Sequence, residues 1–335
     1  MIAGIIAAVA AGGAAALPYI AVAHSTSPYI TAYPWSAGFG TKYANPASLP
    51  VLDGFAVNFS PNSNNIALAI NNTPFVQAYP WNPGFGTKYS NPATLPPDIS
   101  YDIDWSANGN DIAVAHDTTP FITTYAWSAG FGTKYANPAT LPTGNGRGVA
   151  FGGSSFIAIA HQTSPFVTAY PWSSGFGTKY ANPATLPTGN GRSIGFTSTS
   201  DAIAIAHTTS PRVTAYPWSS GFGTKYADPA TLPTGDGSAV NFSSTNAQIA
   251  VGHAITPFIS AYPWSAGFGT KYANPATLPA SQVSGVSFVS TNDAIAASFD
   301  SSPRVAAWPW SPGFGTKYAD PATLPTGSGN DVAYN

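Results

Sequence analysis

The hexapeptide Gly-Phe-Gly-Thr-Lys-Tyr occurs seven times in this chain without a single change, and the rest of the sequence is spaced from it. A tryptophan stands three residues before each copy. The tryptophans are Trp35, Trp81, Trp127, Trp172, Trp218, Trp264 and Trp310. They are 46 residues apart, except for one interval of 45 between Trp127 and Trp172. A fixed period in this range is the sequence signature of a repeat architecture.

Each copy of the repeat reads as four short strands, separated by turns rich in Ser, Thr, Asn, Gly and Pro. In the fifth copy we expect strands A to D at 191–196, 202–207, 211–218 and 224–229. Strand B places Ile203 and Ile205 on one face and alanines on the other, so both faces are apolar. Sheets buried on both faces pack side by side. Four strands repeated seven times predict an all-β protein, a seven-bladed β-propeller of four-stranded antiparallel blades.

The chain ends predict how the ring closes. The first copy begins at strand B, residues 19–24, and has no strand A of the usual pattern. The tail at 329–335 lines up with the strand A at 146–151. We therefore expect residues 331–335 to complete the first blade, so that residues 18–335 form one propeller closed by the C-terminal strand with no exposed sheet edge there.

Two motifs carry a resemblance to known propellers. Ala-Val-Asn-Phe-Ser-Pro-Asn at 56–62, before Ile-Ala-Leu-Ala-Ile at 66–70, resembles the Val-Ala-Phe-Ser-Pro-Asp-Gly step of YVTN-type and WD-repeat propellers. Strand C ends in Tyr-Pro-Trp and is similar to the WD-repeat strand that ends in Trp-Asp. The longer repeat that follows Tyr-Pro-Trp is also similar to repeats in bacteriophage-encoded propellers. The resemblance covers residues 18–335 and implies the fold, without a function.

Composition excludes several kinds of chemistry. Only 7% of the residues are charged, the net charge is −2, and the chain contains neither cysteine nor glutamate. A general nucleic-acid surface, disulfides, zinc–thiolate sites and thiol catalysis are therefore not expected. Asp53, Asp98, Asp102 and Asp104 cluster in the two most divergent inter-blade segments, where they could form a local polar patch. No nucleophile, base and orienting group stand at a suitable spacing, so we expect no enzyme, cofactor or metal site.

The repeated lysines are the candidate binding residues. Each is followed three positions later by Asn or Asp. The lysines are Lys42, Lys88, Lys134, Lys179, Lys225, Lys271 and Lys317. One interpretation is structural, with each ammonium group capping backbone carbonyls of its turn. The other is a set of seven identical small sites, as in propeller lectins. We favour the structural interpretation, and we assign the repeated tryptophans to the core between blades.

Histidine closes strand B in five of the copies. The five are His24, His116, His161, His207 and His253. Ile70 and Phe299 take the same place in the other two copies. Because apolar residues replace it and equivalent positions on different blades lie too far apart to share a metal, this pattern predicts a packing position.

Residues 1–17 form an uncharged Ala/Gly-rich arm that stands apart from the repeats. The arm lacks the basic region of a secretory signal and is too short and weakly apolar for a membrane span. We expect it to pack into a neighbouring protein subunit. The expected function is a non-catalytic structural or interaction propeller in a larger assembly, such as a virion or extracellular surface layer. The alternative is a multivalent propeller that binds glycans. Neither nucleic acid nor a membrane is an expected partner.

Overall fold

The structure is a computed structural model that describes residues 18–335, which contain 22 strands. The strands are β1 (Tyr19–His24), β2 (Ile30–Pro34), β3 (Gly54–Phe59), β4 (Asn65–Ile70), β5 (Val76–Pro80), β6 (Ser100–Trp105), β7 (Asp111–His116), β8 (Ile122–Trp127), β9 (Phe131–Lys134), β10 (Gly146–Gly152), β11 (Phe156–His161), β12 (Val167–Pro171), β13 (Gly191–Phe196), β14 (Ala202–His207), β15 (Val213–Pro217), β16 (Gly237–Phe242), β17 (Gln248–His253), β18 (Ile259–Pro263), β19 (Val283–Phe288), β20 (Ala294–Phe299), β21 (Val305–Pro309) and β22 (Gly329–Tyr334).

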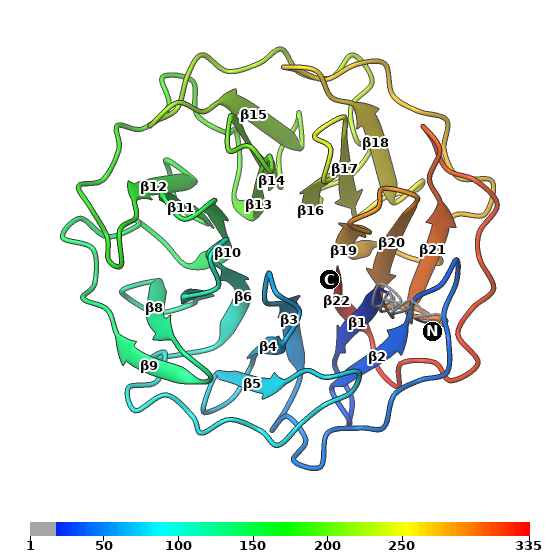
Figure 1. Cartoon of the computed structure of the whole chain (residues 1–335). Coiled ribbons are helices and arrows are strands. Elements are labelled where there is room, and N and C mark those ends of the chain that lie inside the picture. Colours follow the sequence, from blue (N-terminus) through cyan, green and yellow to red (C-terminus); the bar gives the residue numbers. More distant parts are fainter. Residues whose placement is uncertain (1–17) are drawn as a thin grey trace, which may run out of the picture.

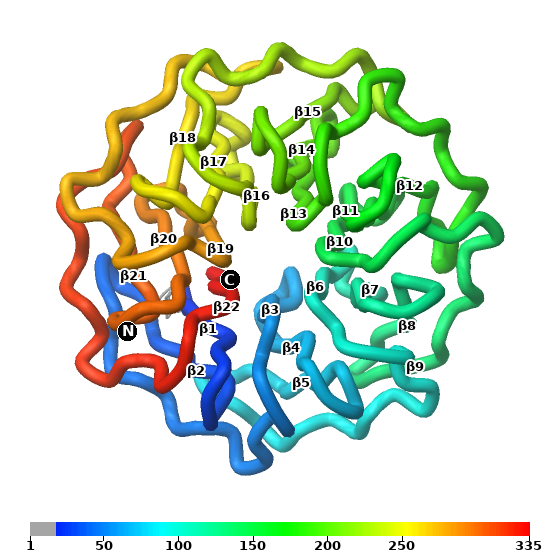
Figure 2. The backbone as a smooth tube through the Cα atoms, turned by 180° about the vertical axis from the view of Figure 1, so that it is seen from behind, coloured from blue at the N-terminus to red at the C-terminus, as the bar shows by residue number. Residues whose placement is uncertain are grey.

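The strands form seven separate antiparallel sheets arranged around a common centre (Figure 1). Seven strands, one from each sheet, line this centre, and Figure 2 shows the same closed ring from behind. The innermost strands are β22, β3, β6, β10, β13, β16 and β19. The prediction of an all-β, seven-bladed propeller is therefore confirmed. Within the described part of the chain there is no helix long and apolar enough to cross a membrane.

The first blade joins the two ends of the described chain. Strand β22 pairs antiparallel with β1, and the register sets Ile20 opposite Tyr334 and Val22 opposite Val332. On its other edge β1 pairs with β2. The prediction that the C-terminal strand supplies the innermost strand of this blade is confirmed. The expected arm at residues 1–17 lies outside the described residues.

The fourth strand differs from the prediction in six of the seven blades. Only the blade of β6, β7 and β8 carries a regular fourth strand, β9, whereas the others have an isolated bridge such as Trp35 to Phe39. Those six blades have proline before the tryptophan, as at Pro34, but the blade with β9 has Ala126. The carbonyl of Pro34 accepts the Gly40 N–H at 2.9 Å, so this residue faces the outer segment. A proline here removes the N–H that a ladder on that side needs.

Aromatic rings fill the space between neighbouring blades. The indole of Trp81 meets Phe85 of its own blade and Tyr43 of the preceding blade, both edge-on, with ring centroids 5.0 and 5.2 Å apart. The buried hydroxyl of Tyr79 donates a 2.8 Å hydrogen bond to the Ser48 carbonyl in the segment between the blades. Edge-to-face pairs of this kind stabilise beyond the area they bury. All seven repeated tryptophans are buried, as a role in the core requires.

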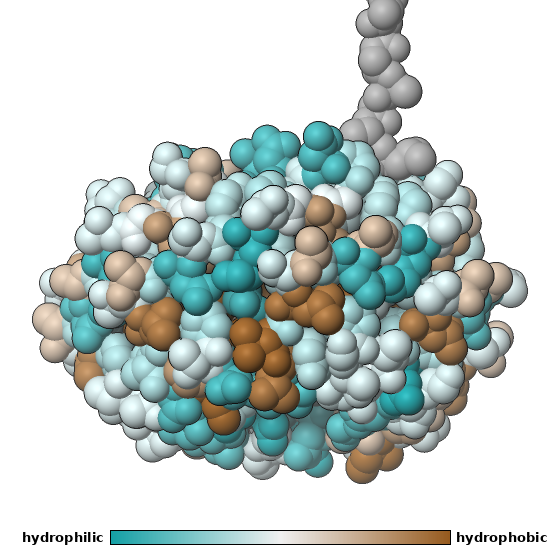
Figure 3. Space-filling view, turned by 90° about the horizontal axis from the view of Figure 1, so that it is seen from below, coloured by the Kyte–Doolittle hydropathy of each residue, from teal (hydrophilic) through white to brown (hydrophobic). Residues whose placement is uncertain are grey.

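The side of the disc in Figure 3 has no single apolar band. In Figure 3, apolar patches on the side shown are scattered among polar and weakly polar residues. The largest exposed apolar side chains of the described residues include Leu49, Val51 and Ile255, from two separate loops. A cavity lies at the centre of the disc.

Candidate functional site in the central channel

A cavity of about 510 Å³ runs through the centre of the disc and is lined by the seven innermost strands. At one mouth, each strand contributes the side chain of its second residue. These mouth residues are Phe55, Tyr101, Arg147, Arg192, Ser238, Ser284 and Asn330. These positions carry five residue types around the ring, whereas the hexapeptide and the tryptophan before it repeat without change. The mouth of the channel therefore breaks the symmetry of the repeat.

One side of the mouth is a stacked wall of three side chains from consecutive blades. The rings of Phe55 and Tyr101 stack with centroids 5.3 Å apart and an angle of 29° between their planes. The Arg147 guanidinium carbon lies 3.6 Å from the centroid of the Tyr101 ring, which is cation–π geometry. Arg147 also pairs with Asp117 at 3.3 Å. Its charge is thus positioned and partly neutralised by its own neighbours.

Arg192 occupies the next place in the ring and has a different environment. It is exposed at the mouth, and among residues 18–335 no hydrogen bond or ion pair to its guanidinium is present. Asp236 lines the same mouth, but its carboxylate pairs with Arg212. Arg192 therefore contributes a positive charge that no described side chain balances.

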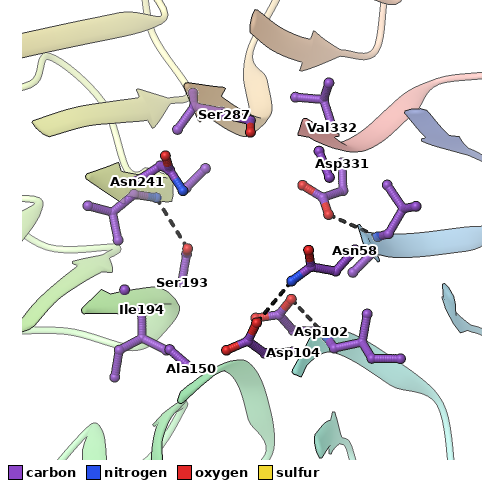
Figure 4. A pocket seen from close by; sticks show the side chains of 18 of the residues that line it. Asn58, Asp102, Asp104, Ala150, Ser193, Ile194, Asn241, Ser287, Asp331 and Val332 are labelled. Carbon is purple, nitrogen blue, oxygen red and sulfur yellow. Dashed lines mark hydrogen bonds between the residues drawn. The ribbon is translucent and has the colours of Figure 1, made fainter. Parts of the chain in front are cut away.

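Below the mouth, three carboxyl groups face one side of the channel (Figure 4). Asp102 accepts a hydrogen bond from the Val149 N–H at 2.8 Å, and Asp104 accepts one from the Phe151 N–H at 2.7 Å. Asp331 accepts one from the Val57 N–H at 3.0 Å. Each bond joins one blade to the next. The carboxyl groups thus satisfy backbone amides on the inner edge of a sheet, where no further strand can pair.

Neutral side chains make the same connection on the opposite side of the channel (Figure 4). Ser193 accepts from the Val240 N–H at 3.2 Å, and Ser287 accepts from the Tyr334 N–H at 3.1 Å. Asn241 accepts from the Phe288 N–H at 3.3 Å. Serine and asparagine can therefore perform the structural task. The negative charge of three aspartates is not required for it.

The surroundings of these carboxyl groups alter their protonation. Burial raises the pKa of Asp104 to about 7, and it does the same for Asp331. Burial, followed by the charge of Asp331, raises the pKa of Asp102 well above its usual value. Groups that titrate near neutral pH can exchange protons with a bound molecule. Asp102 and Asp104 stand two residues apart on β6, so both side chains point to the same face of the strand.

Asp102 and Asp104 are half of the polar patch predicted from the sequence. The structure separates the other two members from them. Asp98 bonds to Thr118, and Asp53 accepts a 3.2 Å hydrogen bond from the Asn71 side chain. Arg192 was not predicted from the sequence, because it matches no motif. Its only signal was that arginine stands at this strand position in two consecutive copies, at Arg147 and Arg192, and not in the other copies.

The repeated lysines lie on the outer segments, away from the channel. The ammonium group of Lys88 donates to the Asn91 side chain at 2.7 Å and to the Tyr89 carbonyl at 3.1 Å. All seven lysines make the bond to the Asn or Asp three positions later. Four of them, Lys42, Lys88, Lys134 and Lys179, also donate to a backbone carbonyl, as the structural interpretation expects. A binding role for the lysines is tested by no observation and stays a prediction.

The histidines that close strand B are buried between strands. Nε2 of His161 lies 2.9 Å from the hydroxyl of Thr168, and burial lowers the pKa of His161 to about 4. The other four histidines have the same arrangement with Thr or Ser. Among the described residues, no group of three or more His or Asp side chains could hold a metal ion.

Comparisons of the sequence with family models and with curated proteins find no match. The fold, in contrast, is similar to solved structures. One is a putative 6-phosphogluconolactonase from Bacteroides uniformis, with a TM-score of 0.73 and 11% identity, covering 96% of this chain and 100% of that one. Another is a functionally unknown protein from Desulfotomaculum acetoxidans, with a TM-score of 0.68 and 11% identity, covering 95% and 98%. At this identity the likeness shows the fold alone.

These comparisons correct the expected function. We expected a non-catalytic structural or interaction propeller, with glycan binding as the alternative. This expectation is wrong, because the similar Bacteroides uniformis propeller is named as an enzyme, a putative 6-phosphogluconolactonase. The expectation that the protein is no enzyme is likewise weakened. In this chain the unbalanced charge and the shifted carboxyl groups lie in the channel. The finer resemblance to YVTN, WD-repeat or phage propellers stays a prediction.

Proposed function

We propose that the protein is a hydrolase that opens a small cyclic ester, such as a sugar lactone, within the central channel. The observation that carries the proposal is the pair Asp102 and Asp104 on one face of β6, with raised pKa values, in a cavity of about 510 Å³. The similar fold of the Bacteroides uniformis protein, a putative 6-phosphogluconolactonase, supports the choice of a lactone.

The chemistry needs one base and one acid. Asp104, with a pKa of about 7, is partly ionised at neutral pH and accepts a proton from an attacking water. The water oxygen bonds to the lactone carbonyl carbon, and the bond from that carbon to the ring oxygen then breaks. Burial raises the pKa of Asp102 well above its usual value, so Asp102 is the group that supplies a proton to the ring oxygen as it leaves. The product is the open hydroxy acid, and no further reactant is consumed.

The test compares glucono-1,5-lactone and its 6-phosphate as substrates at about pH 6.5, where spontaneous ring opening is slow enough to subtract. Asp104→Asn and Asp102→Asn keep an acceptor for the blade-joining amide and remove the proton exchange. We expect each to lower kcat by about 10²-fold or more while the fold is retained. Asp320→Asn, on the rim beside Lys317, is the matched control. No acceleration by the wild type, or equal rates in all variants, would reject the proposal.

A further inference from the structure

The mouth of the channel has a chemistry of its own, distinct from the carboxyl groups below it. Its cationic side consists of Arg147 and Arg192 on neighbouring strands β10 and β13. Arg147 is held by the Tyr101 ring and by Asp117. Arg192 has neither kind of partner among residues 18–335. The mouth therefore combines one fixed guanidinium with one that is available.

The acidic groups nearby do not neutralise Arg192. Asp236 at the mouth is paired with Arg212, and Asp117 is paired with Arg147. The carboxyl groups deeper in the channel accept hydrogen bonds from backbone amides, as Asp102 does from Val149. A positive charge at the mouth of a concave site attracts anions and increases their local concentration.

The opposite side of the mouth offers neutral polar atoms. The amide nitrogen of Asn330 donates to the Gly54 carbonyl at 2.8 Å, which fixes the side chain and leaves its oxygen as an acceptor. Ser238 donates to the Val283 carbonyl. The hydroxyl of Ser284 makes no hydrogen bond within the described part of the chain. This side suits the hydroxyl groups of a ligand.

We propose that the channel mouth is an anion-binding site in which Arg192 binds a compact oxyanion carried by a small polyhydroxylated molecule. Guanidinium presents paired N–H donors that match phosphate and carboxylate oxygens. Arg147 adds a second positive charge from a fixed position on the aromatic wall. Asn330 and Ser284 receive the hydroxyl groups across the mouth. This inference deepens the proposed function by naming an anionic substrate class, and it can be tested without turnover.

The experiment is calorimetric titration at low salt and pH 7 with three probes: glucose 6-phosphate, gluconate and glucose. The first two distinguish a phosphate from a carboxylate as the anionic group, and glucose measures the neutral contacts. The variant is Arg192→Gln. The control is Arg304→Gln, which removes an equal charge from an arginine that donates to the Asp300 carbonyl instead.

We expect at least one anion to bind more tightly than glucose, with Arg192→Gln weakening it by about tenfold or more and Arg304→Gln leaving it unchanged. Equal binding by Arg192→Gln and the wild type, equal weakening by the control, or binding no tighter than that of glucose would overturn the inference. Binding without lactone hydrolysis would reject the proposed function alone. Hydrolysis with a KM for phosphorylated lactone unaffected by Arg192→Gln would reject the anion site alone.

Discussion

The carboxylate of Asp331 accepts a hydrogen bond from the backbone N–H of Val57, with 3.0 Å between the two atoms. Asp331 lies on β22 near the C-terminus, and Val57 lies on β3 of the second blade. The other edge of β22 pairs with β1. Gly285 makes room for this carboxylate, because a Cβ there would lie 2.5 Å from its Oδ1. The closing strand is therefore held on both edges, by its ladder on one and by a side chain on the other.

Replacing Asp331 should weaken the closure of the ring. Asp331→Ala leaves the Val57 N–H without its acceptor, so we expect the free energy of unfolding to fall by about 1–3 kcal/mol. Asp331→Asn keeps an acceptor oxygen and should lose less. Urea unfolding at pH 7 measures both variants. An alanine variant as stable as the wild type would show that the bond contributes nothing to closure.

The buried histidines should make the protein less stable in acid. The pKa of His161 is lowered to about 4 in the folded state, so the unfolded chain binds more protons between pH 6.5 and 4. The stability that the neutral ring contributes is therefore complete above pH 6.5 and is lost as the pH falls toward 4. The blade with Phe299 has Ala306 in place of threonine, so it provides a natural template for removing this dependence.

The double variant His161→Phe/Thr168→Ala copies that template. Its stability should fall less than that of the wild type between pH 6.5 and 4, by about 1.4 kcal/mol per unit of pKa shift removed. Urea unfolding at several pH values across this range gives the comparison. The single variant Thr168→Ala keeps the titrating ring and serves as the control. Identical pH profiles for the double variant and the wild type would contradict the prediction.

The repeat made the fold predictable from the sequence. Seven copies at a fixed spacing, apolar residues on both faces of strand B, and a tail that matches strand A are sufficient for a closed ring of seven blades. The fourth strand was harder to predict, because its regularity depends on one N–H per blade, which Pro34 and its equivalents lack. The effect of the missing N–H can be recognised only when it is known which neighbouring strand each residue's N–H and C=O point toward.

The channel could not be predicted in the same way. Residues that repeat in every copy, such as Trp35 and Lys42, belong to the core and the rim, because every blade needs them equally. A single site on the axis of a ring instead uses residues that only some copies carry, such as Arg147, Arg192 and Asp102. The sequence shows these departures. Only the closed ring shows that they converge.

The lysine on each outer segment should contribute to stability through its hydrogen bonds to residues of its own repeat. Lys179 donates to the Asn182 side chain at 2.5 Å and to the Tyr180 carbonyl at 3.3 Å. Because Asn182 is exposed, we expect a coupling energy of about 0.2–1 kcal/mol. A double-mutant cycle with Lys179→Met and Asn182→Ala measures it. Additive effects of the two substitutions would show that the contact is energetically neutral.

The last prediction is that the residue before the tryptophan decides whether a blade has a regular fourth strand. In a strand, the N–H and C=O of one residue point to the same side. The carbonyl of Pro171 accepts from Gly177 at 2.9 Å, so an N–H at position 171 would also face the outer segment. Pro171→Ala supplies that N–H and should extend the ladder over residues 176–179, as β9 does beside Ala126.

The net change in the free energy of unfolding should be small for this substitution. A new hydrogen bond adds about 0.5–1.5 kcal/mol, whereas losing proline costs about 0.4–1 kcal/mol through the greater freedom of the unfolded chain. This near balance explains how one blade can carry alanine where six carry proline. The informative measurement is therefore hydrogen exchange by NMR, with the amide of Ala126 as the internal reference. The new amide at position 171 should exchange about as slowly as that of Ala126. Exchange at the rate of an unstructured peptide would show that proline is not what interrupts the outer strand.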